Sequence, residues 1–425
     1  MRKKLKTVEV VNLAYSDFKS KLVKKLFKDF YAKNAWKIRP PTSIEKREFA
    51  FILIEGGEMV RHKGFSSLNG LIDYIKSEIP LHVYYSSAYY ANPAAKEMEL
   101  KEWLGADLVF DIDADHIPTR CKEEHDAWRC NNCGAQDRGL LPASCPRCGS
   151  KHVTASSSWL CYQCLEAAKD EAIKLIEDFL IPDFGFSTSE ISISFSGRRG
   201  YHIHIESPKI LSLDPYARRE IVDYIKATEL IPDAQGFEPG LKVPTIGDYG
   251  WRGKLAKGLY LYLSQASVSE LSDVAGPDIT GGGLETWRNN LLKNLEGGSG
   301  PWLLPSSSEA AKKLFERAVA YQRCNIDERV TTDVKRLIRL PGSLHGGTGL
   351  QVLSLSLNDL ERFNPLKSAV AFRTGHLKCF VKHAPQIAMM DQTFGPYHEA
   401  RVELPLAVAL YLLLQGLAEA VGDNS

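Results

Sequence analysis

The sequence predicts an α/β protein whose sheet-forming core is interrupted by a cysteine-rich segment and by a mainly helical segment. Three observations predict this class: period-two alternation of apolar residues recurs in both halves of the chain, seven of the nine cysteines lie between Cys121 and Cys164, and helical patterns dominate from Asp214 to Gln322. With 425 residues, of which 44% are apolar and 25% charged, the chain is long enough to bury a large core.

The charge distribution by itself excludes no class of function. The formal net charge is +1, but residues 2–39 carry twelve Lys and Arg against Glu9, Asp17 and Asp29. Nucleic-acid binding requires such a local basic surface, although a solvated helix face explains the same residues equally well. The apolar run from Leu406 to Leu414 is too short to span a bilayer and no apolar signal region follows the first residues, so we expect a cytosolic protein without a membrane partner.

Patterns along the chain predict the elements in order. Helices are expected over residues 16–35, 166–179, 217–226, 310–321 and 406–421, and strands over 48–54, 81–86, 107–113, 191–195, 201–205 and 351–355. Asp214 caps the third helix, and Ser306 with Glu309 forms a capping box before the fourth. We expect a discontinuous α/β domain of residues 1–213 and 323–400, a zinc-binding insertion at 121–164, a helical insertion at 214–322 and a C-terminal helix at 401–425.

Asp111 and Asp113 end the strand predicted at 107–113. Residues two apart on a strand point to the same face, about 7 Å apart at a rise of about 3.3 Å per residue, so both carboxylates project together. Such a pair suits two Mg²⁺ or Mn²⁺ ions that activate an attacking hydroxyl and neutralise a leaving oxygen. A solvated turn has the same pattern, but Val109 and Phe110 place these acids on an apolar strand, where an unpaired carboxylate pair is unfavourable without a cation.

The tip of the predicted hairpin combines permissive glycines with two guanidinium groups: Ser196, Gly197, Arg198, Arg199 and Gly200. Backbone amides and guanidinium groups in such a turn converge on a polyphosphate. An exposed basic hairpin with half-buried His202 and His204 is the alternative interpretation.

A later segment repeats the combination of acid, base, imidazole and glycine-rich turn. Arg339 and His345 are placed to reach phosphate oxygens. Either Asp327 or Asp333 would complete the metal site, and the residues alone leave that choice open.

The cysteines predict zinc and not disulfides, because a cytosolic protein keeps its thiols reduced. Four of them have the spacing C-x2-C-x11-C-x2-C, which supplies two thiolate knuckles and one tetrahedral site: Cys130, Cys133, Cys145 and Cys148. Cys121, Cys161 and Cys164 remain, with His125 as the nearest fourth ligand, so the segment offers ligands for one or two structural zinc ions. Alternatively, Cys161 and Cys164 are buried small residues at the start of a helix. The distant Cys324 and Cys379 have no partner cysteine nearby in the sequence, and we interpret them as structural.

Together these motifs resemble the small catalytic subunit of archaeo-eukaryotic DNA primases, in particular the archaeal type. The matching blocks are Val109 to Asp113, Ser196 to His202, and Asp327 followed by His345 in a Leu-Pro-Gly-Ser-Leu-His-Gly-Gly run. Their order and spacing extend over most of the chain, and three such blocks are far more specific than one. The resemblance implies a mixed-sheet α/β primase catalytic domain with a helical insertion.

The resemblance also implies a role for each site residue. Asp111, Asp113 and Asp327 would hold the two catalytic Mg²⁺ or Mn²⁺ ions, which favours Asp327 over Asp333. The incoming triphosphate would be contacted by Ser196, Arg198, Arg199, His202, Arg339 and His345, and a segment with Glu48 and Arg61 is similar to the family's early nucleotide-site region. The family's zinc knuckle is similar to Cys121, His125, Cys161 and Cys164, and the four-cysteine ribbon between them departs from the usual short loop.

From this likeness we expect a DNA-dependent primase that joins NTPs or dNTPs on a single-stranded DNA template and releases pyrophosphate by two-metal nucleotidyl transfer. The resemblance further implies a large-subunit partner that this chain lacks. Three alternatives stay open: a related polymerase that extends existing ends with the same three acids, a zinc-ribbon nucleic-acid-binding protein without turnover, and a two-metal hydrolase.

Overall fold

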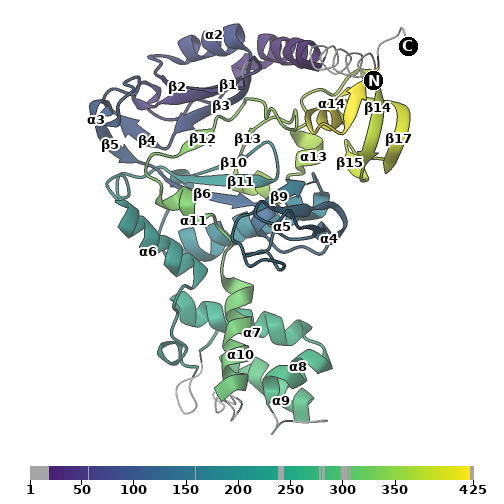
Figure 1. Cartoon of the computed structure of the whole chain (residues 1–425). Coiled ribbons are helices and arrows are strands. Elements are labelled where there is room, and N and C mark those ends of the chain that lie inside the picture. The colour runs from purple at the N-terminus through teal and green to yellow at the C-terminus, as the bar shows by residue number, and fades with distance from the viewer. Residues whose placement is uncertain are drawn as a thin grey trace. The chain divides into compact units, whose positions relative to one another are not determined.

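The computed structural model of the chain describes residues 19–421 except 56, 158, 238–243, 277–278, 280–282, 298–304 and 306–307. These residues form two compact units, both drawn in Figure 1. The first, called the sheet unit here, contains the described residues up to Ile173, Phe186–Arg219 and those from Ile326 onward. The second, the helical unit, contains Lys174–Gly185 and Glu220–Asn325. Among the described residues, no helix has the length and apolarity needed to span a bilayer.

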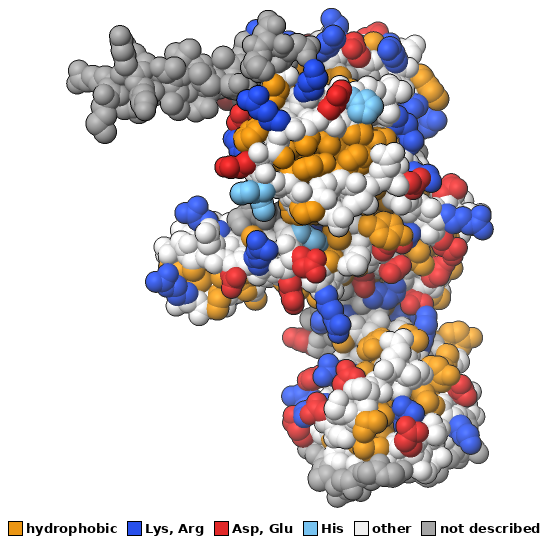
Figure 2. All heavy atoms as spheres, turned by 90° about the vertical axis from the view of Figure 1, so that its right-hand side faces the viewer, with side chains coloured by type: hydrophobic (Ala, Val, Ile, Leu, Met, Phe, Trp, Pro, Cys, Tyr) orange, Lys and Arg blue, Asp and Glu red, His pale blue; other side chains and the backbone are white. Residues whose placement is uncertain are grey.

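An amphipathic helix at residues 19–34 opens the described part of the sheet unit. One face of this helix packs Val23, Phe27, Phe30 and Tyr31 into the core, while its lysines are partly or fully exposed. On the face drawn in Figure 2, basic and acidic side chains are interspersed. The lysines of this helix therefore lie on a solvated face, and their role as a nucleic-acid-binding surface stays a prediction. Four further cations, Arg2, Lys3, Lys4 and Lys6, lie outside the described residues.

The first sheet has four strands in the order β12-β3-β1-β2. These strands are β1 (Phe49–Leu53), β2 (Met59–Lys63), β3 (Pro80–Ser86) and β12 (Leu337–Arg339). Helix α2 (Leu68–Glu78) buries Leu71 and Ile75 in the same core as the sheet, and its cap Ser67 accepts a hydrogen bond from the Gly70 N–H. The strands predicted at 48–54 and 81–86 are confirmed, and β2 and α2 are additional.

The second sheet has the order β13-β10-β11-β6. It comprises β6 (Leu108–Asp113), β10 (Ile191–Phe195), β11 (Gly200–Ile205) and β13 (Leu353–Leu355), which confirms the predicted acidic strand and the predicted hairpin. Every strand pair among the described residues is antiparallel, so the mixed sheet implied by the resemblance is not found there. The two strands of a hairpin, such as β10 and β11, necessarily run in opposite directions. The strands added from distant segments are antiparallel as well: β6 pairs with β11, β12 with β3, and β13 with β10.

The cysteine-rich segment lies between β6 and a long helix. It contains α4 (Lys122–His125) and a three-stranded sheet in the order β8-β7-β9, formed by β7 (Ala127–Cys130), β8 (Gln136–Arg138) and β9 (Val153–Ser157). Helix α5 (Tyr162–Lys174) follows and continues as a π-helical turn at Leu175–Leu180, so the helix predicted at 166–179 begins earlier than expected. Before β6, the short α3 (Met98–Lys101) separates β4 (Ala88–Tyr90) from β5 (Trp103–Ala106).

The chain passes into the helical unit within α6 (Pro215–Lys226), whose cap Asp214 accepts a hydrogen bond from the Ala217 N–H at 2.8 Å, as predicted. The unit contains α7 (Gly250–Gln265), α8 (Val268–Ala275), α9 (Gly283–Leu295) and α10 (Ser308–Gln322). A Cβ on Gly258 would lie 2.3 Å from the Ala318 carbonyl oxygen, so the close approach of α7 and α10 requires glycine. The helix predicted at 310–321 is confirmed, but Ser306 of its predicted capping box lies outside the described residues.

The last part of the sheet unit is mostly strands. Short helices α11 (Glu328–Thr332), α12 (Leu357–Leu360) and α13 (Pro365–Ser368) precede β14 (His376–Ala384), β15 (Ile387–Met389), β16 (Gln392–Phe394), β17 (Tyr397–Pro405), α14 (Leu406–Leu414) and β18 (Ala418–Ala420). The C-terminal helix expected at 401–425 is therefore wrong at both ends, because residues 401–405 belong to a strand and the helix stops at Leu414. Gly416, at a φ of +74°, reverses the chain and lets β18 pair with β14.

Candidate active site and metal centres

Asp111 and Asp113 project from β6 into a polar cavity of ≈ 260 Å³ in the sheet unit. Strands β6 and β11 pair so that Asp111 lies opposite His202 and Asp113 opposite Gly200. The hairpin turn, the segment from β12 to the glycine-rich turn and Tyr84 of β3 complete the wall, so four distant parts of the chain meet here. The lining residues are Tyr84, Asp111, Asp113, Ser196, Arg198, His202, Arg336, Leu337, Ile338, Arg339 and His345.

Burial and the nearby charge of Asp327 raise the pKa of Asp111 to about 6, against the opposing effect of Arg336. Like charges that are held close together and partly out of water disfavour the ionised form. A divalent cation would remove this penalty, and carboxylate oxygens are the ligands that Mg²⁺ and Mn²⁺ prefer. The donor set on β6 therefore fits such ions.

Asp327 lies beside Asp111, although most of the helical unit separates the two residues in the sequence. Its N–H donates a hydrogen bond to the Asp111 carbonyl oxygen at 2.9 Å, and its carboxylate caps α11 by accepting from the Arg329 N–H. Asp333 ends the same helix and accepts from the Lys335 N–H. The geometry thus places Asp327 beside Asp111 and Asp333 at the opposite end of α11, although Asp327 does not line the cavity itself.

The turn between β10 and β11 is tight, and its glycines are required. Gly197 has a φ of +81°, and a Cβ there would lie 2.7 Å from the His345 Cβ. A Cβ on Gly200 would lie 2.1 Å from the Ile112 carbonyl oxygen. The Ser196 hydroxyl accepts from the Gly200 N–H at 3.3 Å and the Arg198 N–H at 3.4 Å. The turn therefore presents Ser196 and Arg198 to the cavity.

Arg199 departs from the prediction that it contacts the triphosphate. Its side chain is only 1% exposed and does not line the cavity. Its guanidinium instead donates to both carboxylate oxygens of Asp126, at 3.3 and 3.0 Å, and lies 2.7 Å from Asp115. Because these two carboxylates neutralise the buried guanidinium, the fork of Arg199 is already bound.

Buried His202 and His345 and half-buried His82 are neutral histidines near the cavity. Burial, followed by the positive charge of Arg339, lowers the pKa of both His202 and His82 to about 3, and the same causes hold the pKa of His345 well below its usual range. The Nε2 of His202 lies 3.6 Å from Asp111. The Nδ1 of His345 accepts from the Gly347 N–H at 3.1 Å, which leaves the ring proton on Nε2. His345 is thus poised as a hydrogen-bond donor without a charge.

Sequence reasoning missed three residues at this site. Tyr84 and Arg336 line the cavity, and the Arg339 guanidinium lies over the Tyr84 ring at 5.1 Å. His82 contacts both Arg339 and the edge of His345, with ring centroids 4.8 Å apart. The alternation of His82 and Tyr84 on β3 was a usable signal, but only the pairing of β3 with β12 reveals which face they share.

Glu48 and Arg61, expected near the nucleotide site by resemblance, lie together but outside the cavity lining. Arg61 donates to Glu48 at 3.1 Å, and the buried Lys101 donates to the other carboxylate oxygen at 2.6 Å. Lys101 lowers the pKa of Glu48 against the effect of its burial. The paired Glu48 carboxylate thus links the start of β1 to β2 and to the end of α3.

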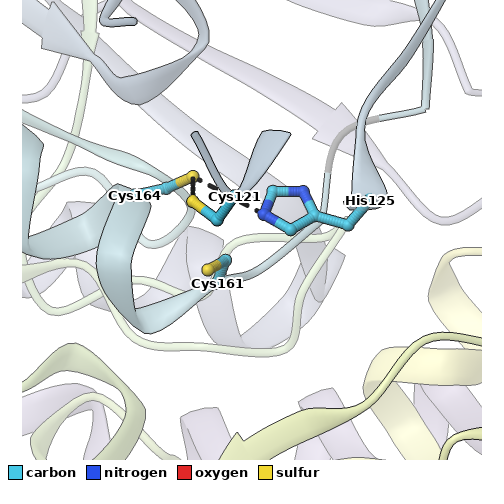
Figure 3. Close-up of side chains that lie close together, drawn as sticks. All are labelled: Cys121, His125, Cys161 and Cys164. Atoms are coloured by element: carbon cyan, nitrogen blue, oxygen red, sulfur yellow. Dashed lines mark hydrogen bonds between the residues drawn. The ribbon is translucent and has the colours of Figure 1, made fainter. Parts of the chain in front are cut away.

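Four of the predicted zinc ligands form one group, called the inner cluster here: Cys121, His125, Cys161 and Cys164 (Figure 3). The Cys121 and Cys164 sulfur atoms are 3.5 Å apart, and the Cys164 sulfur is 3.8 Å from the His125 Nε2. A tetrahedral zinc site with bonds of about 2.3 Å has ligand–ligand edges of about 3.8 Å. The three sulfurs and one imidazole nitrogen fit zinc in chemistry and in spacing.

The other four form a second group, called the outer cluster here: Cys130, Cys133, Cys145 and Cys148. Sulfur atoms are 3.7 Å apart in the pairs Cys130–Cys148 and Cys133–Cys145. Each Cys-x-x-Cys pair is followed by a left-handed glycine, Gly134 at a φ of +72° and Gly149 at +69°. The two knuckles thus have the same backbone turn. Among the described residues, Asp111, Asp113 and Asp327 do not gather as tightly as either cluster.

The sequence was compared with known protein families and curated proteins. Residues 150–356 match the family model described as DNA primase small subunit. The chain is 36% identical to the DNA primase small subunit PriS of Methanothrix thermoacetophila, across 89% of this chain and 93% of that protein. It is 33% identical to the protein of the same name from Methanococcoides burtonii, across 95% and 99%, and 31% identical to that of Natronomonas pharaonis, across 93% and 97%.

Proposed function

The chain belongs to the archaeal-type DNA primase small subunit family, and from this premise we propose that it synthesises short RNA primers on single-stranded DNA. The reaction is nucleotidyl transfer from NTPs with release of pyrophosphate. The observation that carries the proposal is the cavity that joins the acids of β6 with Arg198, Arg339 and His345. Carboxylates for cations on one wall and guanidinium groups on another are the two halves of a site for a metal-bound triphosphate.

Two Mg²⁺ or Mn²⁺ ions held by Asp111, Asp113 and Asp327 would supply activation of the 3′-hydroxyl and neutralisation of the leaving pyrophosphate. The protein groups do the positioning. Arg198 and Arg339 bind triphosphate oxygens as forks, and the Ser196 hydroxyl and the Nε2 proton of His345 donate further hydrogen bonds. Neutral His202 lines the same cavity, with its Nε2 3.6 Å from Asp111, and would contact the triphosphate as the resemblance implies. Arg199 is not part of this set.

We assign the zinc to the two cysteine clusters, one ion in each. Both offer four closed ligands and no open position, which is typical of structural zinc. The segment around them has few buried apolar residues of its own, so metal–ligand bonds replace a core. The proposed domain organisation follows the two units: the sheet unit is the catalytic part, with the zinc-binding segment 121–164 inserted in it. The helical insertion predicted at 214–322 corresponds to Glu220–Asn325, and Lys174–Gly185, which were assigned to the catalytic part, belong to the helical unit as well.

The partners are a single-stranded template, NTPs and a second, large primase subunit. The names of the relatives call them small subunits, which supports a larger partner. Template phosphates would be held by surface cations, so template affinity is expected to fall steeply with salt.

The direct test measures pyrophosphate release on an unprimed single-stranded template with NTPs and Mg²⁺ or Mn²⁺. Asp111→Ala, Asp113→Ala and Asp327→Ala are each expected to lower the rate by at least about 1,000-fold with an unchanged circular dichroism spectrum. Asp333→Ala is the matched control, because this acid ends the same short helix, and its rate should stay near that of the wild type.

Other outcomes would redirect the proposal. Incorporation only on primed templates would indicate a polymerase that extends existing ends. Template binding without pyrophosphate release, indifferent to Asp327→Ala, would indicate a nucleic-acid-binding protein held together by zinc. Retained synthesis in the Asp111→Ala variant would contradict the metal site.

A further inference from the structure

Arg199 lies at the centre of a buried chain of polar contacts that leads away from the cavity. Its guanidinium is shared between Asp126 and Asp115, with distances of 3.0 Å and 2.7 Å. Both acids are mostly buried, with side chains 9% and 26% exposed. A buried arginine with two carboxylate partners is held in one orientation, because any rotation leaves an uncompensated charge.

On one side the chain of contacts ends at the inner cluster. The Asp126 carboxylate lies 2.8 Å from the Nδ1 of His125 and also accepts from the Trp159 N–H at 3.0 Å. His125 directs its other nitrogen, Nε2, toward Cys164 (Figure 3). A carboxylate behind a metal-binding histidine fixes the tautomer and the direction of the ring.

On the other side the contacts end at the acids of β6. The Asp113 carboxylate accepts from the Asp115 N–H at 2.9 Å, so Asp115 and Asp113 are linked directly. The Arg199 carbonyl accepts from the Ala114 N–H at 3.1 Å, and the next residue, Gly200, pairs with Asp113. The side chain and the backbone of Arg199 thus hold residues 113–115 together.

A second brace runs in parallel. The buried Lys122 of α4 donates to the carbonyl oxygens of Ala114 and Ile117, at 2.8 Å for the latter. Helix α4 carries His125 at its other end. The segment after Asp113 is therefore tied twice to the helix that carries a ligand of the inner cluster.

We propose that Arg199 is a positioning residue that transmits the geometry of the inner cluster to Asp113 and to the Ser196–Gly200 turn. The inference rests on the proposed function for its catalytic readout, but not for its metal readout. It assigns adjacent arginines different tasks: Arg198 faces the nucleotide, and Arg199 faces the metal-bearing helix. A filled inner cluster would hold His125 and Asp126 in place, and through Arg199 would keep Asp113 at its working position.

The test compares Arg199→Lys and Asp126→Asn with Arg198→Lys in the full chain. Lysine keeps the charge but lacks the fork that spans Asp126 and Asp115, and asparagine keeps the shape of Asp126 without its charge. Both inner variants should lower kcat by about 10- to 100-fold while KM for the NTP stays within about twofold. Arg198→Lys should instead raise KM for the NTP by about tenfold.

Zinc release to a chromogenic chelator gives a readout independent of activity. The two clusters should release zinc in two phases, and Arg199→Lys and Asp126→Asn should accelerate only the inner-cluster phase, by about tenfold. Arg198→Lys should leave both phases unchanged. A raised KM for Arg199→Lys with unchanged zinc release would overturn the proposal and make Arg199 a triphosphate ligand. If the wild type shows no synthesis, the proposed function fails, and the zinc-release phases still decide whether Arg199 and the inner cluster are linked.

Discussion

The two cysteine clusters have equivalent chemistry but different surroundings. The inner cluster draws ligands from both ends of α4 and from the start of α5, and its Cys121 and Cys164 are 43 positions apart. The outer cluster draws all four ligands from one ribbon, in which Cys130 and Cys148 are 18 positions apart. The first therefore joins separate elements of the sheet unit, whereas the second closes a loop on itself.

The neighbours of the clusters differ in the same way. Beside the inner cluster, the Trp159 backbone N–H donates a hydrogen bond to Asp126. Its indole N–H donates to the Gln386 carbonyl oxygen, and its ring packs against Tyr411 of α14. Around the outer cluster, Trp128 packs with Cys130 and Cys145 inside the ribbon. The consequence of losing a structural metal is therefore expected to depend on what its ligands connect, and not on the ligand set.

Removal of a buried inner ligand is expected to have the largest effect. Cys164→Ser should remove one zinc ion, lower the free energy of unfolding by more than about 3 kcal/mol and abolish primer synthesis, because His125 and Asp126 lose their anchor. Zinc content, chemical denaturation and pyrophosphate release measure the three effects. Cys145→Ser, also buried but in the outer cluster, is the matched control; equal losses in both variants would remove the distinction.

Thiol reagents should distinguish the clusters by accessibility. Cys148 of the outer cluster is exposed, whereas Cys164 of the inner cluster is fully buried. Titration with an organomercurial should therefore release the outer zinc faster, since no cysteine of the inner cluster is as exposed as Cys148. Primer synthesis should persist after the first equivalent of zinc has been released. Loss of synthesis in step with the first equivalent would show that the outer cluster supports the cavity.

Removal of the hydrogen bond that joins Leu160, next to the inner cluster, to Tyr411 of α14 should have a moderate effect on stability. The Tyr411 hydroxyl accepts a hydrogen bond from the buried Leu160 N–H at 3.1 Å. Tyr411→Phe leaves this N–H without its acceptor and should lower the free energy of unfolding by about 1–3 kcal/mol, measured by urea denaturation. Tyr162→Phe, at a side chain on the same segment that is 46% exposed, should be neutral.

Replacement of the ribbon is expected to have the smallest effect. Cys130 of β7 and Val153 of β9 are directly paired, so an Asn-Gly turn can replace residues 131–152, with Cys130 changed to Thr. The free energy of unfolding of the remaining protein should fall by only about 1 kcal/mol, because the pairing of β8 with β7 and the hydrogen bond from the Gly139 N–H to the Asp126 carbonyl oxygen are lost. Synthesis at saturating template should stay within about threefold. A larger loss of synthesis would show that the ribbon serves the reaction directly.

Local patterns predicted much of the sheet unit. Alternation located β6 and the hairpin, and cysteine spacing grouped the eight ligands as the structure places them. The burial of the Arg199 side chain was not predictable, because nothing in the sequence distinguishes Arg199 from Arg198. Only the fold brings Asp126, 73 positions away, into contact with Arg199. The choice of Asp327 over Asp333 likewise needed the resemblance, and the hydrogen bond to Asp111 now gives it a geometric basis.

Two errors have different causes. The C-terminal helix was extended too far because apolar residues continue past Leu414, although Gly416 marked a stop. His82 and Tyr84 were missed because alternation along β3 shows that their side chains share a face, but not which other residues that face contacts. The first error misused a local signal, whereas the second concerns information that only the pairing of distant segments contains.

The hydrogen bond from the Asp327 N–H to the Asp111 carbonyl oxygen has a consequence for biosynthesis. The whole helical unit is translated between these two residues, so a nascent chain carries its first two acids long before the third emerges from the ribosome. On the proposed mechanism, chains that terminate inside the helical unit are inert, and catalytic competence is acquired as a late, long-range docking event during folding.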